Sequence, residues 1–242
     1  MRRCKQSGFA LPFSIAVSAI GFLMVLALAV SGRGSTITAA WRKPVVGSAF
    51  TLVCSLGIIL AESPRKCSET YGHRRSMRKT NFPAHASSFT VRTEGHHHDC
   101  GMFSAHTIHV NGHILCAACT GLFLGALVAL FGTAVYFFGE FDWPQFGFLA
   151  VGIGVLAMTL GFLQLKFEHF VRLIVNMLFV LGGFLILVGM DELTGSLFVD
   201  LFSIVLIVFW LFTRILLSQW DHSRICRKCG RVCDISGEVK EG

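Results

Sequence analysis

Two Cys-x-x-Cys pairs are the residues of this sequence best suited to chemistry: Cys116 with Cys119, and Cys226 with Cys229. Two intervening residues allow both thiolates of a pair to reach one metal ion, and Gly230 after the second pair permits the tight turn that such sites use. Four thiolates complete a tetrahedral zinc site. The spacing therefore predicts one metal site shared by the two pairs, with zinc as the expected ion.

A histidine-rich segment before the first pair adds further candidate ligands. Three consecutive histidines at 96–98 lead into Cys100, and His106, His109 and His113 follow. Cys100 is the reserve ligand, because it could form a local three-sulfur site with Cys116 and Cys119 that a histidine completes. Two other interpretations stay open: the pairs are thiol redox groups, or they are structural cysteines that share no ion.

Composition indicates that these cysteines belong to a membrane protein. The chain is 53% hydrophobic and only 14% charged, with a mean hydropathy of +0.65. A soluble domain carries about 25% charged residues. Crossing a bilayer takes a stretch of roughly 20 apolar residues. Stretches close to or above that length and without charge, apart from Asp200 in the last, occupy residues 6–32, 44–61, 114–139, 143–165, 173–190 and 193–213.

We therefore expect an all-α integral membrane bundle of about six transmembrane helices. Short connections between the last four helices predict antiparallel neighbours. Gly121 and Gly125 predict a small-residue face for close helix packing, with Gly152, Gly182, Gly183 and Gly189 as further points of close approach. The predicted parts are a two-helix hairpin with a signal-like start (1–61), a polar His-rich cytoplasmic loop (62–113), a four-helix membrane core (114–217) and a cysteine-containing cytoplasmic tail (218–242).

The distribution of charge predicts the orientation. Lysine and arginine gather in residues 62–113, in the short loop 166–172 and in the tail, whereas the loops at 140–142 and 191–192 contain only acidic charges. The positive-inside rule places the basic segments, both termini and both cysteine pairs in the cytoplasm. Orientation accounts for the net charge of +7, so the lipid bilayer is the expected partner and nucleic acid is not; protein partners stay open.

Two features fit this scheme less well. Residues 31–43 should lie outside, yet they carry Arg33, Arg42 and Lys43. Asp200 lies inside the last apolar stretch, where an acid can be a proton or ion site. Because Asp200 is near the outer interface, we expect it to be solvated.

Residues 95–126 resemble a family of predicted bacterial and archaeal membrane proteins of unknown function. The hallmark of that family is an upstream Cys/His segment, a glycine, and Cys-x-x-Cys-Thr-Gly entering a membrane helix with a further glycine. Ala118 and Gly101 depart from it, since the family often has arginine and histidine there. The resemblance implies a cysteine site and no known activity. The matching positions are Cys100, Gly112, Cys116, Cys119, Thr120, Gly121 and Gly125.

The sequence lacks the P-loop, dinucleotide-binding and serine-triad motifs of common enzymes. We expect a non-enzymatic membrane protein whose cytoplasmic zinc site clamps the third helix to the C-terminal tail, in a structural or regulatory role. One alternative is a small transporter or metal-handling protein, with the His-rich loop delivering ions. The other is a membrane thiol oxidoreductase. The expected zinc ligands are Cys116, Cys119, Cys226 and Cys229, with Cys100 in reserve.

Overall fold

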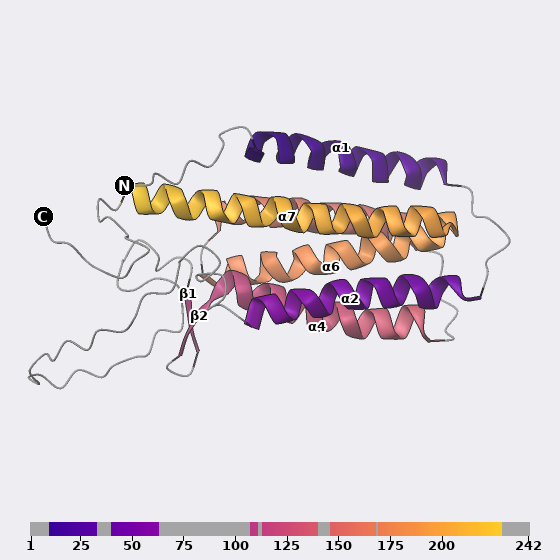
Figure 1. Cartoon of the computed structure of the whole chain (residues 1–242), viewed down its shortest axis with the longest axis horizontal. Coiled ribbons are helices and arrows are strands. Elements are labelled where there is room, and N and C mark those ends of the chain that lie inside the picture. The colour runs from indigo at the N-terminus through magenta and orange to yellow at the C-terminus, as the bar shows by residue number, and fades with distance from the viewer. Residues whose placement is uncertain are drawn as a thin grey trace, which may run out of the picture.

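The computed structural model describes residues 10–32, 40–62, 107–110, 113–139, 146–167 and 169–228. These residues form six long helices and one short strand pair (Figure 1). The predicted all-α bundle of six helices is confirmed. The helices are α1 (Ala10–Ser31), α2 (Arg42–Glu62), α4 (Ala117–Phe137), α5 (Gly147–Phe162), α6 (His169–Thr194) and α7 (Leu197–Lys228), and α5 continues into a short 3₁₀ helix, η2 (Leu163–Lys166).

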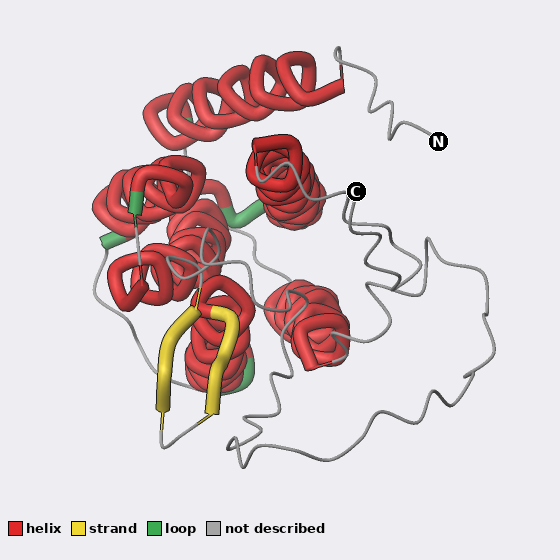
Figure 2. Tube along the Cα trace, turned by 90° about the vertical axis from the view of Figure 1, so that its left-hand side faces the viewer, coloured by secondary structure: helices red, strands yellow, loops and turns green. Residues whose placement is uncertain are grey.

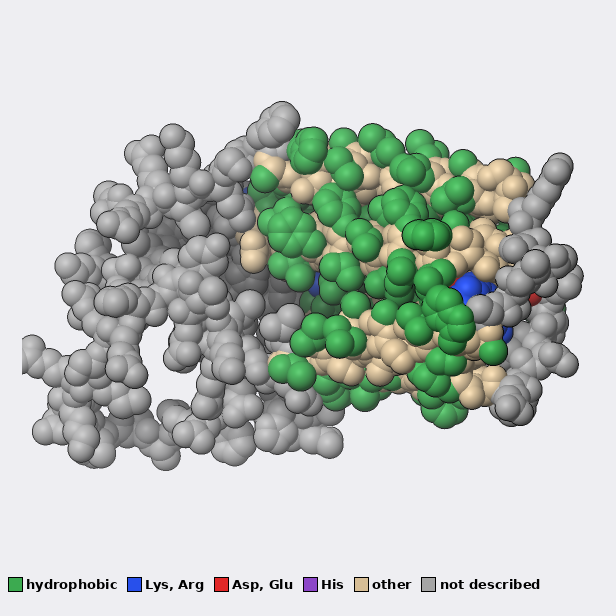
Figure 3. Space-filling view, turned by 45° about the vertical axis from the view of Figure 1, so that its right-hand side comes forward, with side chains coloured by type: hydrophobic (Ala, Val, Ile, Leu, Met, Phe, Trp, Pro, Cys, Tyr) green, Lys and Arg blue, Asp and Glu red, His purple; other side chains and the backbone are tan. Residues whose placement is uncertain are grey.

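The surface of the helices is suited to lipid. All six helices are long and apolar enough to cross a membrane. Large apolar side chains point outward, including Phe198, which is 85% exposed, and Val30, which is 75% exposed. Figure 3 shows hydrophobic side chains over most of the described face, with Lys and Arg visible near its right-hand end. A helix satisfies its own backbone hydrogen bonds, as a bilayer interior requires. The chain is therefore a multi-pass integral membrane protein.

Successive helices run in opposite directions. The end of α4 meets the end of α6, where Tyr136 bonds to Asp191, and the start of α2 meets the start of α7, where Arg42 bonds to Asp200. We call the end at which α4 begins the cysteine end, because Cys116 lies there, and the opposite end, with Asp191 and Asp200, the aspartate end (Figure 1). This alternation brings the start of α1 and the end of α7 to the cysteine end.

Helix α6 is the centre of the bundle. Its most extensive contacts are with α4 and α5, and it also contacts α1 and α7. In the apolar 18-residue stretch of α6, 56% of the residues are buried inside the protein, compared with 28–33% in the same stretch of the other five helices. Figure 2 shows the bundle from the cysteine end, with α1 uppermost and inclined to the other helices. Residues carried by α6 are therefore placed to connect the other helices.

Helices α1 and α2 pack on different parts of the four-helix group instead of pairing mainly with each other. α1 lies against α7, where the Phe22 and Trp210 rings stack with centroids 4.3 Å apart and the Ser18 hydroxyl donates to Thr213 at 3.1 Å. α2 lies mainly against α4. The apolar stretches predicted both helices, but they did not predict these separate partners.

The predicted glycine face of α4 joins α4 to α6. A Cβ atom on Gly121 would lie 2.2 Å from the backbone oxygen of Leu173, and one on Gly125 would lie 2.8 Å from that of Met177. Only glycine permits this approach, so the expected role of both residues in close packing is confirmed. Gly152, also expected to pack closely, has nothing within 4 Å of its added Cβ, so that expectation was wrong.

A short hairpin leads into α4. Strand β1 (Thr107–Val110) pairs antiparallel with β2 (His113–Cys116), with Val110 opposite His113. This register leaves Asn111 and Gly112 between the strands, the residue pair most typical of a two-residue hairpin turn. Residues 62–113 were predicted to form a loop, so this hairpin was not predicted. The hairpin lies at the cysteine end (Figure 1).

The last helix is longer than predicted. The sequence analysis began a tail at residue 218, but α7 continues to Lys228, so Cys226 lies in its last turn. The continuation is explained by contacts beyond the apolar stretch, since Asp221 of α7 lies 3.9 Å from Arg172 of α6. The end of an apolar stretch indicates where a helix leaves the lipid. The helix itself can continue beyond that point.

Candidate functional site

The first cysteine pair lies where the hairpin enters α4. Cys116 is the last residue of β2 and the N-cap of α4, and Cys119 follows in the first helical turn. A side-chain hydrogen bond with Cys119 is the main effect that lowers the pKa of Cys116, to about 5. Backbone N–H groups of Ala118 and Cys119 and the charge of Arg172 act in the same direction, against the effect of burial. These effects together favour the thiolate form of Cys116.

Two buried arginines support this thiolate from α6 and α7. Arg172 and Arg214 are each only 3% exposed, and both are within electrostatic range of Cys116. Arg172 has Asp221 as its acidic neighbour, at 3.9 Å. Among the described side chains next to Cys116, the two guanidinium groups and one carboxylate leave one positive charge in excess, which a Cys116 thiolate balances.

Neutral acceptors hold Arg214 in place. Its Nε donates to Asn176 Oδ1 at 2.8 Å, and its Nη2 donates to Gln164 Oε1 at 3.0 Å. Asn176 in turn donates to the backbone oxygen of Arg172 at 2.6 Å. Gln164 comes from η2, Asn176 from α6 and Arg214 from α7, so this network joins three helices beneath the cysteine pair. The network was not predicted, because Gln164 and Asn176 each lie alone in an apolar stretch and Arg214 directly follows another.

The structure brings together two of the predicted ligands, Cys116 and Cys119. Cys226 lies in the last turn of α7, but its side chain is outside the described part, and Cys100 and Cys229 lie outside the described residues altogether. Among the residues that the structure describes, no group of three or more His, Cys, Asp or Glu side chains is arranged to hold a metal ion. The four-cysteine site thus stays a prediction, and α6, the main partner of α4, separates α4 from most of α7.

A second polar cluster occupies the aspartate end. Arg42 of α2 lies 2.7 Å from Asp191 of α6 and 2.5 Å from Asp200 of α7. Tyr136 of α4 donates to Asp191 at 2.9 Å, and the Lys43 ammonium lies 4.7 Å from the centre of the Tyr136 ring. The cluster therefore joins α2, α4, α6 and α7.

Asp200 corrects the sequence analysis. We expected a solvated side chain, but Asp200 is fully buried. The physical reason is Arg42, which is buried in the same place and supplies the counter-charge that a carboxylate needs in a bilayer. Arg42, which did not fit the predicted charge pattern, was the signal, because a buried acid at the same end of the bundle accounts for it.

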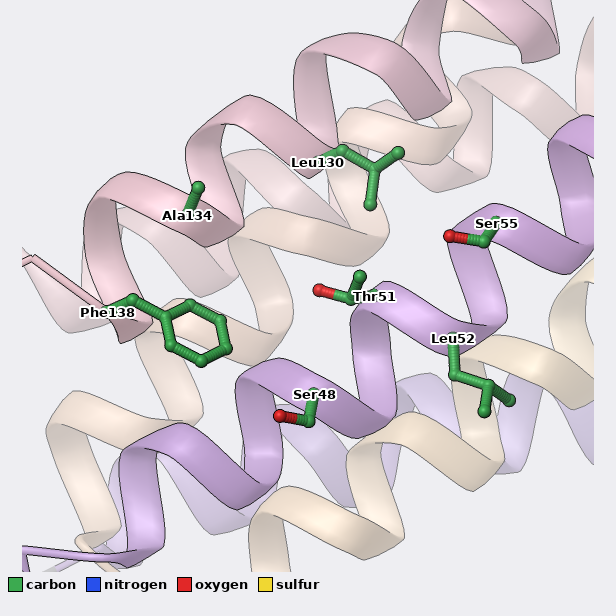
Figure 4. Close-up of a pocket in the computed structure, with 7 residues that line it drawn as sticks. All are labelled: Ser48, Thr51, Leu52, Ser55, Leu130, Ala134 and Phe138. Carbon is green, nitrogen blue, oxygen red and sulfur yellow. The ribbon is translucent and has the colours of Figure 1, made fainter.

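A surface groove between α2 and α4 contains neither cluster (Figure 4). It offers hydroxyl groups from α2 but no thiol or charged side chain. It is therefore a poor candidate for metal binding. Its lining residues are Ser48, Thr51, Leu52, Ser55, Leu130, Ala134 and Phe138.

No family model, curated protein or solved structure matches the chain. The resemblance of residues 95–126 to a membrane-protein family thus rests on its motif. The coarser features hold: six apolar helices, and a cysteine pair at the start of a membrane helix.

Proposed function

We propose that this integral membrane protein binds zinc through cysteine thiolates on its cytoplasmic face, in a structural or regulatory role. Cys116 and Cys119 supply two ligands, and Cys226 and Cys229 supply the other two. Cys100 is the reserve ligand. The ion clamps the start of α4 to the end of α7 and the residues after it.

The observation that carries this proposal is the placement of Cys116 and Cys119 on one helical turn, with Cys116 favoured as a thiolate. Zinc binds thiolate and not thiol, so a site with a lowered pKa loses less free energy on releasing a proton to the solvent. Arg172 and Arg214 would also offset part of the negative charge that four thiolates give a zinc ion.

The position of Cys226 agrees with a clamp. It lies five residues beyond Asp221, whose neighbour Arg172 is also within electrostatic range of Cys116. The charge pattern of the sequence favours the cytoplasm for this end, and the reducing cytoplasm favours metal binding over structural disulfides.

The test is the zinc content of the full chain purified in mild detergent. We expect close to one ion per chain, and loss of that ion in Cys116→Ser, Cys119→Ser, Cys226→Ser and Cys229→Ser. Cys54→Ser is the matched control, because Cys54 is a lone buried thiol of α2. Retention of zinc in Cys226→Ser and Cys229→Ser, with loss in Cys100→Ser, would replace the shared site by a local one. Weak, exchangeable metal would favour a metal-handling transporter.

A second candidate function is thiol–disulfide exchange, and the lowered pKa of Cys116 favours it as well. In such a reaction the Cys116 thiolate attacks a disulfide of a substrate and expels one of its sulfurs as a thiolate; Cys119 then attacks the mixed disulfide, which oxidises the pair and reduces the substrate. Chain purified without metal, with a reversible Cys116–Cys119 disulfide and a mixed disulfide trapped in Cys119→Ser, would establish this function instead.

A further inference from the structure

The charges of the aspartate-end cluster do not balance. Arg42 contributes one positive charge, and Asp191 and Asp200 contribute two negative charges when both are ionised. All three side chains are at least 94% buried. An uncompensated charge in a bilayer or protein interior is strongly destabilising. One further positive charge is needed for neutrality.

Among the residues that the structure describes, nearby groups do not supply that charge. The other described titratable side chains at this place are Lys43 of α2, Tyr136 of α4 and Glu192 of α6. Lys43 and Glu192 carry opposite charges and cancel, and Tyr136 is a neutral donor to Asp191. The described residues of α1 include no titratable side chain, and in α5 and η2 the one such residue is Lys166, at the cysteine end.

Polar atoms inside the cluster point to a missing proton. Among the described residues, Asp200 Oδ1 and Arg42 Nε are buried without a hydrogen-bond partner. Asp191 Oδ1 and Asp200 Oδ2 lie 2.7 Å and 2.5 Å from the same nitrogen, Arg42 Nη1, which brings the two carboxyl groups side by side. Two carboxylates that face each other repel, whereas a carboxylic acid donates to a carboxylate.

We propose that Asp191 and Asp200 form a proton-binding site in which the two carboxyl groups share one proton beside Arg42. The shared proton neutralises the cluster and gives the pair a hydrogen bond. A metal cation would fit less well, because it would lie next to the guanidinium group and needs about six oxygen ligands. The site lies at the opposite end of the bundle from the cysteine pair and does not depend on the zinc proposal.

Infrared spectroscopy of the full chain in detergent tests the site directly, because a protonated carboxyl group has a carbonyl-stretch band that ionised carboxylates lack. At neutral pH we expect the band of one buried acid in the wild-type protein, shifted in heavy water. Asp191→Asn and Asp200→Asn should each remove it, while the amide preserves the shape of the protonated group. Asp221→Asn, the same substitution in an acid at the cysteine end, is the matched control and should keep the band.

Three results would overturn the proposal. The first is a wild-type protein with no such band at neutral pH, a result that needs no variant to fold. The second is a band that persists in both Asp191→Asn and Asp200→Asn, which would assign the proton to another acid. The third is loss of the band on adding sodium, potassium or calcium at constant pH, which would identify a cation site in place of a proton site.

Discussion

At the scale of single residues, Cys116 differs from the other described cysteines in its surroundings. Cys54 is enclosed by apolar side chains of the core, whereas Cys116 lies at a helix N-terminus beside a second thiol and two arginines. A thiolate is the form that binds metals and attacks disulfides. The fold therefore favours the reactive thiolate form of Cys116 without any bound ligand.

The pH dependence of alkylation should reveal the lowered pKa of Cys116. After removal of metal with a chelator, Cys116 should react at half its maximal rate near pH 5, because its pKa is lowered to about 5. The rate should fall below that pH, as the thiolate takes up a proton, and stay level above it. In Cys119→Ala the profile should move toward the ordinary cysteine pKa of about 8.5, since the side-chain hydrogen bond from Cys119 is the main cause of the shift. Mass spectrometry of the Cys116 peptide gives the rate. A wild-type rate that still rises tenfold between neutral and mildly alkaline pH would contradict a lowered pKa of Cys116 and the hydrogen bond from Cys119 that explains it.

Arg42 should contribute strongly to stability. Arg42→Ala leaves Asp191 and Asp200 buried without their counter-charge, and breaking a buried ion pair from one side costs about 3–5 kcal/mol. The free energy of unfolding in detergent measures the loss. Arg224→Ala is the control, because exposed Arg224 only lies over the Trp220 ring at 5.5 Å and should change stability by less than about 0.5 kcal/mol. Equal losses in the two variants would mean that Arg42 is not buried as described.

At the scale of helices, contact with α6 decides where the other elements lie. α4 reaches Arg172 because Gly121 lets its backbone touch that of α6 near Leu173. α5 approaches α6 in the same way, with an added Cβ on Gly154 only 2.7 Å from the Gly182 backbone oxygen. The thiol pair therefore depends on small residues that carry no chemistry themselves.

Gly121→Ala should separate α4 from α6. The new methyl group would meet the Leu173 backbone oxygen at 2.2 Å, so the helices must move apart, and overpacking of this kind costs about 1–3 kcal/mol. The shift should also raise the pKa of Cys116, by moving it from Arg172. Gly152→Ala is the matched control: its Cβ meets nothing within 4 Å, so the change should be neutral or stabilise the helix by up to about 1 kcal/mol. Unfolding and alkylation of both variants would test this, and a Gly121→Ala protein as stable as the control would show that the close approach is absent.

The sequence predicted the helices and the Gly121 contact well, because length, hydropathy and small-residue spacing are local properties. It did not predict the Arg42–Asp200 or Arg214–Gln164 contacts. These join residues from separate stretches, and one sequence does not show which solitary polar residues meet. The strand pair was a different kind of miss, since Asn111-Gly112 was a visible turn signal. The roles of Cys100, Cys226 and Cys229 stay predictions, because their side chains lie outside the described part of the chain.

At the scale of the whole molecule, the two ends carry opposite buried charges. The cysteine end has an excess of arginine that a thiolate balances, and the aspartate end has an excess of carboxylate for which we propose a shared proton. α6 and α7 take part in both clusters, through Arg172 and Asp191 on α6 and through Asp200 and Arg214 on α7. A shift of either helix along its axis would therefore disturb both ends together.

Orientation can be tested on whole cells. The charge pattern predicts that the aspartate end lies outside. A cysteine introduced by Ser196→Cys, between α6 and α7, should react with a membrane-impermeant maleimide in intact cells. A cysteine introduced by Ser223→Cys, in the last part of α7, should react only after the membrane is opened. Labelling in the reverse order would place the thiol pair outside the cell and remove the main reason for expecting metal in place of a disulfide.

The distance along the chain between Arg42 and Asp200, 158 residues, has a consequence for biosynthesis. Helix α2 leaves the ribosome long before either of its acidic partners exists. At roughly 5–20 residues per second, Asp200 follows Arg42 after roughly 8–30 s. During that interval the guanidinium group must extend to the water at the membrane surface, as long basic side chains do. Synthesis of α6 and α7 supplies the two acids that allow Arg42 to withdraw into the bundle, so the last helices made complete the packing of one of the first.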